Sequence, residues 1–354
     1  MAATSVVVLD RGNNTTCTVN LFGATVVSWR VNNQEQLFVS KQAVFDGKRA
    51  IRGGIPFVFP QFGQWAFGPQ HGFARVARWR VEKLPERLPS GDVEAVFSLV
   101  DDDFTRSMWH FQFRLTYRLI LREKELHFNV GVYNPSKELT FSCQLLLHTY
   151  FKVPDVRRSQ VTGMHGCMFI DKTREGAIYQ ETREVVTINE WTDRVYQNTA
   201  PEHIITNVVS GRKMRIQKYN FPDTVIWNPW SEFAKEIPDL GDEEYGNMVC
   251  VEAGRVAAPI VLLPGTAFEA SQILQVLYSP AQYSDMWAWR RAASPRPSCC
   301  CPAPPSRPAR SCRYCTARHN TATCVRGGGP RRRAHRAAAR HRLRGQPDPA
   351  GDVR

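Results

Sequence analysis

Apolar and polar residues alternate with a period of two along most of the first 280 positions of the chain. Between 111 and 119 every second residue is Phe, Leu or Tyr, and after the polar turn REKE the segment 126–132 repeats the alternation. Successive side chains of a strand point to opposite faces, so the pattern predicts two half-buried strands joined by a short turn.

Segments of the same kind recur throughout this region, whereas apolar residues at helical spacing are scarce. We interpret the N-terminal MAATSVVVLDRGN as a first strand, and we expect further strands at 24–31, 74–83, 93–100, 142–153, 184–189, 213–219, 247–253 and 268–278. Many short strands separated by Gly, Pro, Asn and Asp predict an all-β fold, a large antiparallel β-sandwich.

The composition changes sharply near Asp285. Residues 286–354 contain 16 Arg, no Lys and two acidic residues, and they lack the apolar content that a packed core requires. We therefore expect a β-sandwich domain over 1–285 and a disordered, low-complexity tail rich in Arg, Pro and Cys over 286–354. The tail resembles an out-of-frame or intron-derived C-terminus, and we expect no specific function for it.

The net charge of +13 belongs to this tail, because residues 1–285 hold 30 basic and 31 acidic residues. Clustered Arg binds phosphate backbones non-specifically, so an RNA-associated role of the tail is one alternative, although no specific nucleic-acid partner is expected. A zinc site formed by Cys312, Cys315, His319 and Cys324 is a weaker alternative, since the spacing matches no strong ligand template.

The four cysteines outside the tail are widely spaced in apolar contexts: Cys17, Cys143, Cys167 and Cys250. That pattern is typical of reduced thiols in a reducing compartment. The N-terminus has no basic segment ahead of its short apolar run, and no apolar run approaches the ~20 residues of a membrane span. We expect a cytoplasmic monomer with no membrane partner.

Two loop segments carry residues suited to an anion and a sugar. In RGGIPFVFPQFG the paired glycines allow a ligand to approach the backbone, and Arg52 can bind phosphate or carboxylate. In QHGFAR, Gln70 and His71 can bond sugar hydroxyls and Arg75 adds a second cation. The alternatives are a solvated turn arginine and a histidine that only shapes its loop.

Two further segments each place one ionisable residue among apolar neighbours. His148 lies in LLLHTYF, where burial favours the neutral imidazole, and Glu252 lies in VCVEAG, where an unpaired carboxylate is costly. A structural core residue is the alternative for each. Together they supply an acid and a base, and Trp227 and Trp230 offer flat faces to sugar C–H groups. No P-loop, HExxH or catalytic triad is present, so acid/base chemistry on a sugar, without metal or cofactor, remains.

These motifs, in this order, resemble one known family. RGGIPFVFPQFG, QHGFAR, LLLHTYF, TDRVYQN, DTVIWNPW and VCVEAG are similar to the segments of the glucose-6-phosphate 1-epimerase (hexose-6-phosphate mutarotase) family, part of the aldose 1-epimerase group, from about residue 5 to residue 280. After about 280 the chain departs from the family, which puts the closure of the last strand in question.

The resemblance implies a galactose-mutarotase-like sandwich that interconverts the α and β anomers of a hexose 6-phosphate, with glucose 6-phosphate the expected substrate. It implies His148 and Glu252 as the catalytic residues. From the chemistry of ring opening we expect Glu252 to be the general base and His148 the general acid. The substrate-binding positions fall on Arg52, Gln70, Arg75 and Asp193, and His71 is added from the residues themselves. None of the family's positions is substituted here.

Other classes of function remain open at this stage. A mutarotase for unphosphorylated aldoses and a non-catalytic carbohydrate-binding sandwich would keep the same cleft. A glycoside hydrolase usually needs two carboxylates that flank the scissile bond, and only Glu252 is a persuasive buried carboxylate here.

Overall fold

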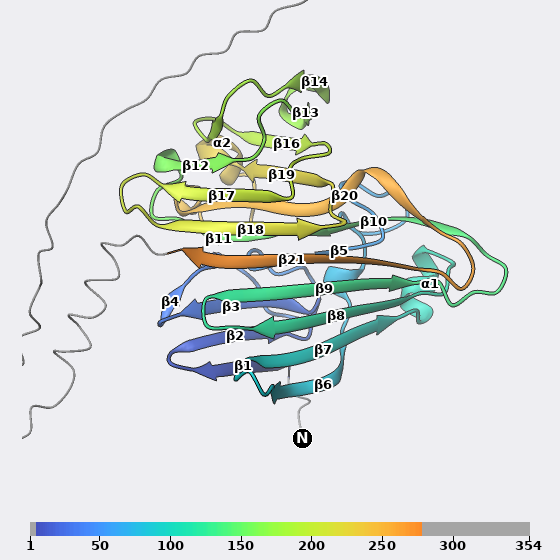
Figure 1. Ribbon diagram of the computed structural model, residues 1–354. Coiled ribbons are helices and arrows are strands. Elements are labelled where there is room, and N and C mark those ends of the chain that lie inside the picture. Colours follow the sequence, from blue (N-terminus) through green and yellow to red (C-terminus); the bar gives the residue numbers. More distant parts are fainter. Residues whose placement is uncertain (1–4, 278–354) are drawn as a thin grey trace, which may run out of the picture. The chain divides into compact units, whose positions relative to one another are not determined.

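The structure is a computed structural model that describes residues 5–277, which form three β-sheets (Figure 1). Neighbouring strands in each sheet pair antiparallel. The all-β antiparallel fold predicted from the sequence is thereby confirmed. The predicted tail 286–354 and its boundary near residue 285 lie outside the described residues.

One layer is a nine-stranded sheet whose strands lie in the order β15, β12, β17, β18, β21, β9, β8, β7, β6. The bounds of these strands are Val185–Thr187, Ser159–Thr162, Glu202–Asn207, Lys213–Tyr219, Ala267–Leu277, Glu125–Tyr133, Arg114–Leu121, Val93–Val100 and Arg80–Arg87. The alternation that predicted a hairpin over 111–132 corresponds to β8 and β9, which pair from Arg114–Tyr133 to Leu121–Leu126.

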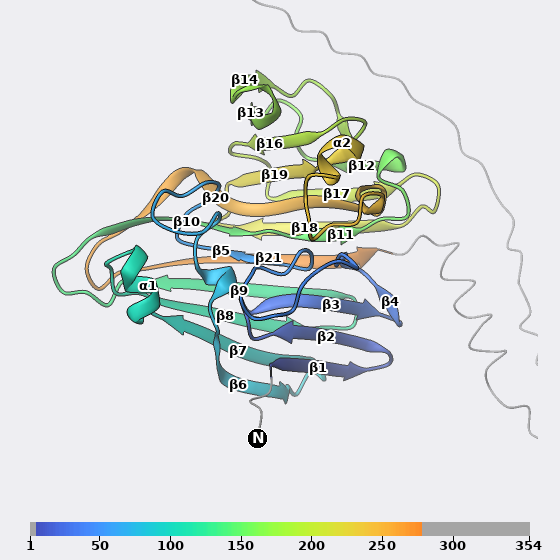
Figure 2. The same cartoon turned by 180° about the vertical axis from the view of Figure 1, so that it is seen from behind.

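The other layer, which faces the viewer in Figure 2, contains an eight-stranded sheet in the order β14, β13, β16, β19, β20, β10, β5, with β11 paired to β20. The bounds are Ala177–Gln180, Met168–Asp171, Thr192–Tyr196, Asp223–Asn228, Met248–Leu262, Phe141–Leu147, Phe57–Val58 and, for β11, Tyr150–Lys152. A four-stranded sheet extends this layer, with strands β1 (Val6–Gly12), β2 (Thr15–Asn20), β3 (Thr25–Val31) and β4 (Gln34–Glu35). An isolated bridge from Val26 to Ile55 joins the two sheets.

Helices are few and short among the described residues. Two are α-helices, α1 (Asp103–Met108) and α2 (Trp230–Ala234), and four are 3₁₀ helices, η1 (Ala74–Val76), η2 (Val156–Arg158), η3 (Lys172–Arg174) and η4 (Glu244–Asn247). Helix α1 begins at a capping box in which Asp102 and Thr105 bond each other's backbone N–H groups. The scarcity of helix agrees with the scarcity of helical spacing in the sequence.

The main hydrophobic core fills the space between the two layers. It joins side chains of β3, β5, β10 and β20 to side chains of β8, β9 and β21, among them Trp29, Phe57, Leu145, Leu147, Val251, Tyr117, Phe128 and Leu274. Fully burying a large apolar side chain contributes roughly 1.5–3 kcal/mol each, so this core stabilises the pairing of the layers. The core packs against one face of the eight-stranded sheet and leaves the opposite face available for other contacts.

That other face carries a second, smaller cluster. On these strands, residues that alternate with the core residues point to this outer face. They pack against side chains of α2 and of the segment that follows it. The cluster includes Leu146, Tyr150, Val225, Trp227 and Cys250 from the strands, and Ala234, Ile237 and Leu240 from α2 and the segment after it. The outer face of the eight-stranded sheet is therefore itself partly covered. A site can form between this face and the segments that pack on it.

Three of the strands listed from the sequence differ from the observed elements, and β8 starts at Arg114 although the alternation begins at 111. The segment 74–83 begins as η1, and β6 starts only at Arg80, because Trp79 donates its indole N–H to the Ala74 carbonyl at 2.9 Å and folds the chain back. The segment 142–153 is interrupted after Leu147, and the segment 247–253 continues as β20 to Leu262. The last described strand, β21, pairs with β9 from Ala267 to Gln275 and with β18 from Ser271 to Leu277, so it has a partner strand on each side.

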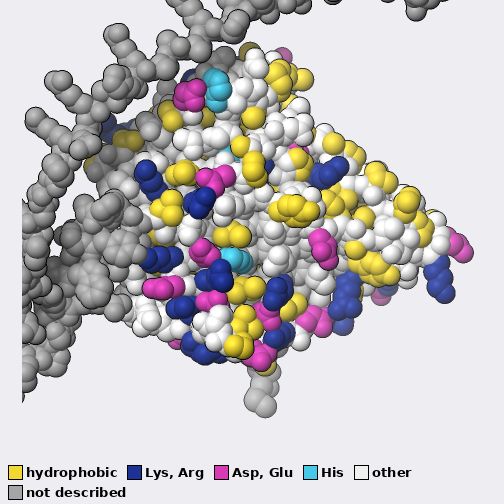
Figure 3. All heavy atoms as spheres, in the orientation of Figure 1, with side chains coloured by type: hydrophobic (Ala, Val, Ile, Leu, Met, Phe, Trp, Pro, Cys, Tyr) yellow, Lys and Arg dark blue, Asp and Glu magenta, His cyan; other side chains and the backbone are white. Residues whose placement is uncertain are grey.

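Basic and acidic side chains are interspersed over the face seen in Figure 3, in keeping with the near-zero charge of residues 1–285. Cys17, Cys143, Cys167 and Cys250 are free thiols, as predicted. In the described part of the chain, no helix has both the length and the apolar character needed to cross a membrane.

Candidate active site

The floor of the candidate site is a row of side chains across four strands of the eight-stranded sheet. Tyr150 on β11 pairs with Cys250 on β20, Cys250 pairs with Trp227 on β19, and Trp227 pairs with Asp193 on β16. Paired residues of neighbouring strands point to the same face, and so do residues two apart on one strand. Glu252 therefore shares this face with Asp193, although 59 positions separate them in the sequence.

His148 lies where β10 stops and β11 begins. Its backbone N–H donates to the Pro56 carbonyl at 3.0 Å, and the Tyr150 N–H donates to the Gly54 carbonyl at 2.9 Å. These two hydrogen bonds hold residues 148–150, between β10 and β11, against the loop that follows Arg52. The imidazole stacks on the Tyr150 ring with centroids 4.8 Å apart and meets Trp227 edge-on at 6.2 Å. The rotation of the imidazole is thus fixed by aromatic neighbours.

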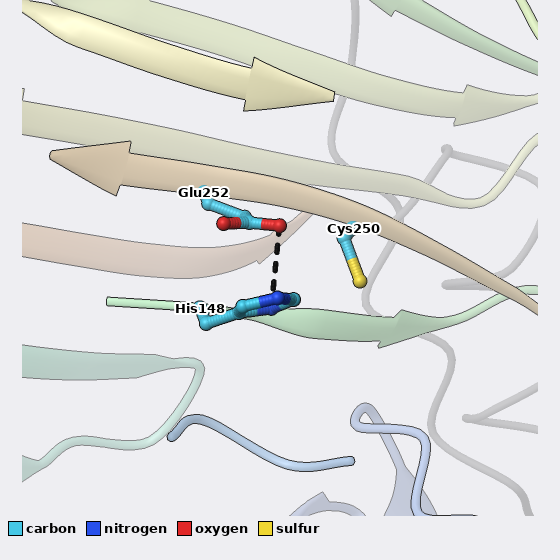
Figure 4. Close-up of side chains that lie close together, drawn as sticks. All are labelled: His148, Cys250 and Glu252. Atoms are coloured by element: carbon cyan, nitrogen blue, oxygen red, sulfur yellow. Dashed lines mark ion pairs between the residues drawn. The ribbon is translucent and has the colours of Figure 1, made fainter. Parts of the chain in front are cut away.

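His148 and Glu252 meet at the centre of this face (Figure 4). The Nδ1 atom of His148 lies 3.2 Å from Oε1 of Glu252, and the two side chains are 9% and 1% exposed. The angles do not make this contact a hydrogen bond. Among the described side chains, neither oxygen of Glu252 has a hydrogen-bond partner, nor does Nδ1 of His148. A buried carboxylate without donors is costly in a purely structural role, so this geometry favours a functional one.

Burial shifts both pKa values away from the charged forms. It raises the pKa of Glu252 well above the ordinary value, with a further contribution from the negative charge of Asp193. It lowers the pKa of His148 well below the ordinary value, and the positive charges of Arg75 and Arg52 add to the shift. The usual preference of a proton for imidazole over carboxylate is therefore weakened in this pair.

Arg52 reaches the cleft from the loop before β5. Its Nε donates to Oδ1 of Asp239 at 3.0 Å, and its Nη1 donates to the Tyr150 hydroxyl at 3.3 Å. The loop passes so close to β3 that a Cβ on Gly54, at φ +67°, would lie 2.1 Å from the Val26 carbonyl oxygen. Only glycine fits there, which explains the paired glycines of the motif.

A second loop supplies Gln70 and His71 and leads into η1, which carries Arg75. The Gly63 N–H donates to Nδ1 of His71 at 3.1 Å, and the His71 N–H donates to the Gly63 carbonyl at 2.8 Å. Because Nδ1 accepts, the neutral ring carries its proton on Nε2. The ring lies edge-on to His148 with centroids 5.6 Å apart. Burial lowers the pKa of His71 well below its ordinary value, and Arg75 contributes to the shift, so His71 is a neutral donor.

Arg75 is a partly buried cation that lacks a carboxylate partner among the described ion pairs. Its Nη2 donates to the Gln70 carbonyl at 2.7 Å, but its Nε has no hydrogen-bond partner in the described structure. Burial lowers the pKa of Arg75 to about 10. A guanidinium in this condition is suited to receive an anion.

All seven residues singled out in the sequence line one cleft of about 200 Å³: Arg52, Gln70, His71, Arg75, His148, Asp193 and Glu252. Aromatic and apolar side chains complete the walls: Phe62, Trp191, Val225, Trp227, Phe233 and Ile237. Trp191 and Phe233 stack on each other with ring centroids 4.6 Å apart. Apolar walls around a few converging polar groups are typical of small-molecule sites.

Sequence reasoning missed three polar contributors to the site. Lys172 lines the cleft, Asp239 holds Arg52, and Tyr150 stacks on His148. Lys172 and Asp239 stand in segments without a recognisable motif, and only strand register or loop folding brings them to the cleft. Tyr150 could have been found from its position two residues after His148 in LLLHTYF, since such neighbours share a face.

One group of described side chains has metal-ligating atoms close together. Ligand atoms of His148, Cys250 and Glu252 lie within 4.8 Å of one another (Figure 4). Burial, together with the charge of Glu252, raises the pKa of the Cys250 thiol well above its ordinary value, which keeps the thiol protonated, and thiolate is the ligand form. A protonated thiol is a poor metal ligand, but the thiol pKa does not test whether the reaction needs a metal. The expectation that no metal or cofactor is required stays a prediction.

A comparison with protein families decides the relationship. The family described as aldose 1-epimerase matches residues 5–275. The chain belongs to the aldose 1-epimerase family. Within it, a protein of Cenchrus ciliaris named "Putative glucose-6-phosphate 1-epimerase" is 32% identical over 285 residues, covering 78% of this chain and 85% of its own. A protein of Escherichia coli (strain K12) with the same name is 31% identical over 238 residues, covering 66% and 77%.

Solved structures of aldose 1-epimerase relatives have the same fold. The crystal structure of "a putative mutarotase (YeaD) from Salmonella typhimurium" superposes with a TM-score of 0.71 at 28% identity, covering 77% of this chain and 90% of that one. A galactose mutarotase related enzyme from Lactobacillus acidophilus gives 0.62 at 16% identity, covering 77% and 97%. The galactose-mutarotase-like fold and the family resemblance inferred from the motifs are confirmed.

Proposed function

We propose that this aldose 1-epimerase family member interconverts the α and β anomers of a hexose 6-phosphate, with glucose 6-phosphate the expected substrate. The observation that carries the proposal is the convergence of a buried imidazole and an unpartnered buried carboxylate, 3.2 Å apart, in a cleft with two arginines. The names of the relatives from Cenchrus ciliaris and Escherichia coli support the choice of sugar phosphate.

Glu252 is the general base. Mutarotation requires loss of the proton from the C1 hydroxyl while the ring oxygen gains one, so that the C1–ring oxygen bond breaks and an open-chain aldehyde forms. Both carboxylate oxygens of Glu252 lack protein donors, and a C1 hydroxyl would supply one. The raised pKa of this carboxyl makes it a stronger base than an exposed glutamate.

His148 is the general acid toward the ring oxygen. Its lowered pKa makes the imidazolium a strong proton donor, and the stacked Tyr150 holds the ring in place for the transfer. After rotation about the C1–C2 bond the roles reverse. His148 takes back the proton from the hydroxyl at C5, Glu252 returns its proton to the C1 oxygen, and the ring closes as the other anomer.

Arg75 and Arg52 bind the 6-phosphate. The charge of Arg52 is already balanced by Asp239 at 3.0 Å, whereas Arg75 is partly buried and has no carboxylate partner among the described residues. A phosphate monoester, with about −1.5 to −2 charges at pH 7, would supply the missing counter-charge. The phosphorylated sugar should therefore bind better than the free sugar.

The remaining polar groups hold the sugar hydroxyls. Gln70, the Nε2–H of His71 and the carboxylate of Asp193 all line the cleft, and Trp227 presents an aromatic face beside them. No step of this mechanism uses a metal ion or a cofactor. The walls built by Trp191 and Phe233 shield the reacting atoms from bulk water.

The direct test is an NMR measurement of anomer exchange with glucose 6-phosphate and with free glucose in parallel. The protein is assayed with and without an excess of EDTA. We expect rapid exchange of the phosphorylated sugar, a much lower kcat/KM for the free sugar, and no effect of the chelator. Equal rates for the two sugars would assign the protein to unphosphorylated aldoses. Binding without exchange would support the non-catalytic sandwich instead.

A further inference from the structure

The turn that carries Lys172 is fixed by a buried carboxylate. Asp171, at the end of β13, is fully buried and accepts hydrogen bonds from the Thr173 N–H at 3.0 Å, from Arg174 at 2.6 Å and from Arg194 at 3.2 Å. Asp171 also caps η3, the 3₁₀ turn that starts at Lys172. The backbone of Lys172 therefore has a defined place beside β16.

Strand register sets Lys172 next to Asp193. Asp171 pairs with Arg194 in the antiparallel ladder of β13 and β16, so the next residue along β13 lies beside the preceding residue of β16. The Nζ of Lys172 lies 3.6 Å from Oδ2 of Asp193 and 4.9 Å from the centre of the Phe62 ring. Lys172 thus continues the row of cleft-floor residues by one position.

We propose that Lys172 is a positioning residue that keeps the Asp193 carboxylate ionised and turned into the cleft to accept a hydrogen bond from a sugar hydroxyl. The inference rests on the proposed function, because it assigns the substrate contact through Asp193. It differs from a phosphate-binding role, in which Lys172 would contact the substrate itself.

Asp193 needs such a partner because its surroundings disfavour its charge. Burial raises the pKa of Asp193, and the ion pair with Lys172 opposes that rise. The negative charges of Asp193 and Glu252 disfavour each other, since Asp193 contributes to the raised pKa of Glu252. Charged and titratable groups surround Asp193 from several elements. They are Asp171, Lys172, His71, His148, Arg52, Arg75 and, two strands away on β20, Cys250 and Glu252.

The place of Lys172 in the sheet separates it from the phosphate end. Arg52 lies in the loop before β5 and Arg75 on η1, both at one end of the eight-stranded sheet, whereas Lys172 follows β13, near the other end. Its Nζ is engaged by a carboxylate, whereas Arg75 has none. The geometry therefore assigns the arginines to the phosphate and Lys172 to Asp193.

The test compares Lys172→Met and Lys172→Arg with the wild-type full chain, using kcat and KM from pH 5 to 9 on glucose 6-phosphate and on glucose. Without the lysine, Asp193 binds a proton at higher pH, so the acid limb of 1/KM should move to higher pH for both sugars. A displacement of one pH unit lowers 1/KM about tenfold below the limb. Lys172→Arg should restore the wild-type limb. Lys235→Met, which removes an exposed lysine just after α2, is the matched control and should leave the limb in place.

The outcomes are distinguishable. An acid limb that does not move in Lys172→Met would overturn the inference, and so would a loss confined to the phosphorylated sugar, which would make Lys172 a phosphate ligand. Failure of the wild-type protein to exchange anomers would instead contradict the proposed function. In that case the pH dependence of the thermal stabilisation by glucose 6-phosphate, compared between wild type and Lys172→Met, still decides the role of Lys172.

Discussion

At the scale of single residues, the cleft is organised by charges that the protein leaves incompletely satisfied. Glu252 has two buried oxygens without donors, and Arg75 has a buried Nε without a hydrogen-bond partner and no carboxylate among the described ion pairs. Each costs folding free energy, since isolated buried charges are unfavourable. The substrate offers a hydroxyl to the first and a phosphate to the second, so binding would relieve both.

Arg75→Met should separate binding from folding. Losing a charge-assisted contact of about 1.5–3 kcal/mol should lower kcat/KM for glucose 6-phosphate by roughly ten- to a hundredfold. The kcat/KM for free glucose should change little. Thermal unfolding of the free protein should show no large fall in Tm, because the charge that is removed has no carboxylate partner among the described residues. A parallel loss for both sugars would contradict the assignment of Arg75 to the phosphate.

At the scale of elements, two loops position the site because glycines let them pass close to neighbouring backbone. Gly72 has φ +75°, and a Cβ there would lie 2.1 Å from the Phe59 carbonyl oxygen. Gly91, in the turn before β7, also has a positive φ of +82° but has nothing within 4 Å of the added atom. Comparing an alanine substitution at Gly72 with one at Gly91 therefore separates the cost of the left-handed backbone from the cost of steric overlap.

Gly72→Ala should destabilise the protein more than Gly91→Ala. Both substitutions place alanine in a left-handed conformation, which costs about 1–2 kcal/mol, but only the first forces backbone atoms apart. Chemical denaturation should show a clearly larger loss of unfolding free energy for Gly72→Ala, together with reduced activity from the displaced His71 and Arg75. Equal losses would mean that the loop adapts to the extra atom.

The edge beside β14 contains a carboxylate whose pairing makes stability depend on pH. Burial alone would raise the pKa of Glu181, but Arg183 and the Tyr196 hydroxyl bond the ionised form and lower the pKa to about 2. A depressed carboxyl pKa stabilises the fold above the unfolded value, near 4.3, and that contribution is lost as the pH falls towards 2. Urea unfolding between pH 5 and 2 should therefore show a weaker pH dependence in Glu181→Gln than in wild type. An unchanged slope would contradict this.

The sequence foretold these elements unequally. Period-two alternation located β8, β9 and β18 closely, because each has one buried and one solvent-facing side. It failed at 74–76, where buried Phe73 and Ala74 require a turn that alternation does not encode. Lys172 and Asp239 were missed because their places in the site depend on cross-strand register and on loop folding. The seven predicted residues were found because motifs carried them, and their roles stay predictions.

At the scale of the whole molecule, two layers hold the site while the basic tail stands apart in composition. Strand β21 pairs with β9 through Gln275 and with β18 through Leu277, and residues 1–285 are close to neutral. The departure from the family's pattern after about 280 therefore begins beyond the described part of β21. The domain boundary near 285 remains a prediction from composition.

A chain that ends at residue 285 should keep the Tm and kcat/KM of the full chain within about twofold. It should lose any salt-dependent binding to single-stranded RNA that the full chain shows. The truncation removes the excess arginines, and the remaining residues 1–285 carry nearly equal numbers of basic and acidic side chains. Fluorescence anisotropy at several salt concentrations checks the second part. A large loss of activity on truncation would show that the segment after 285 contributes to the fold or to the cleft.

The most direct test of the central claim is the anomer exchange rate of Glu252→Gln at saturating glucose 6-phosphate. The substitution keeps the size of the side chain and removes the base, and a general base contributes about 10²–10⁴-fold to the rate. We predict a fall of that size with nearly unchanged binding of the sugar phosphate. Exchange at close to the wild-type rate would contradict the account.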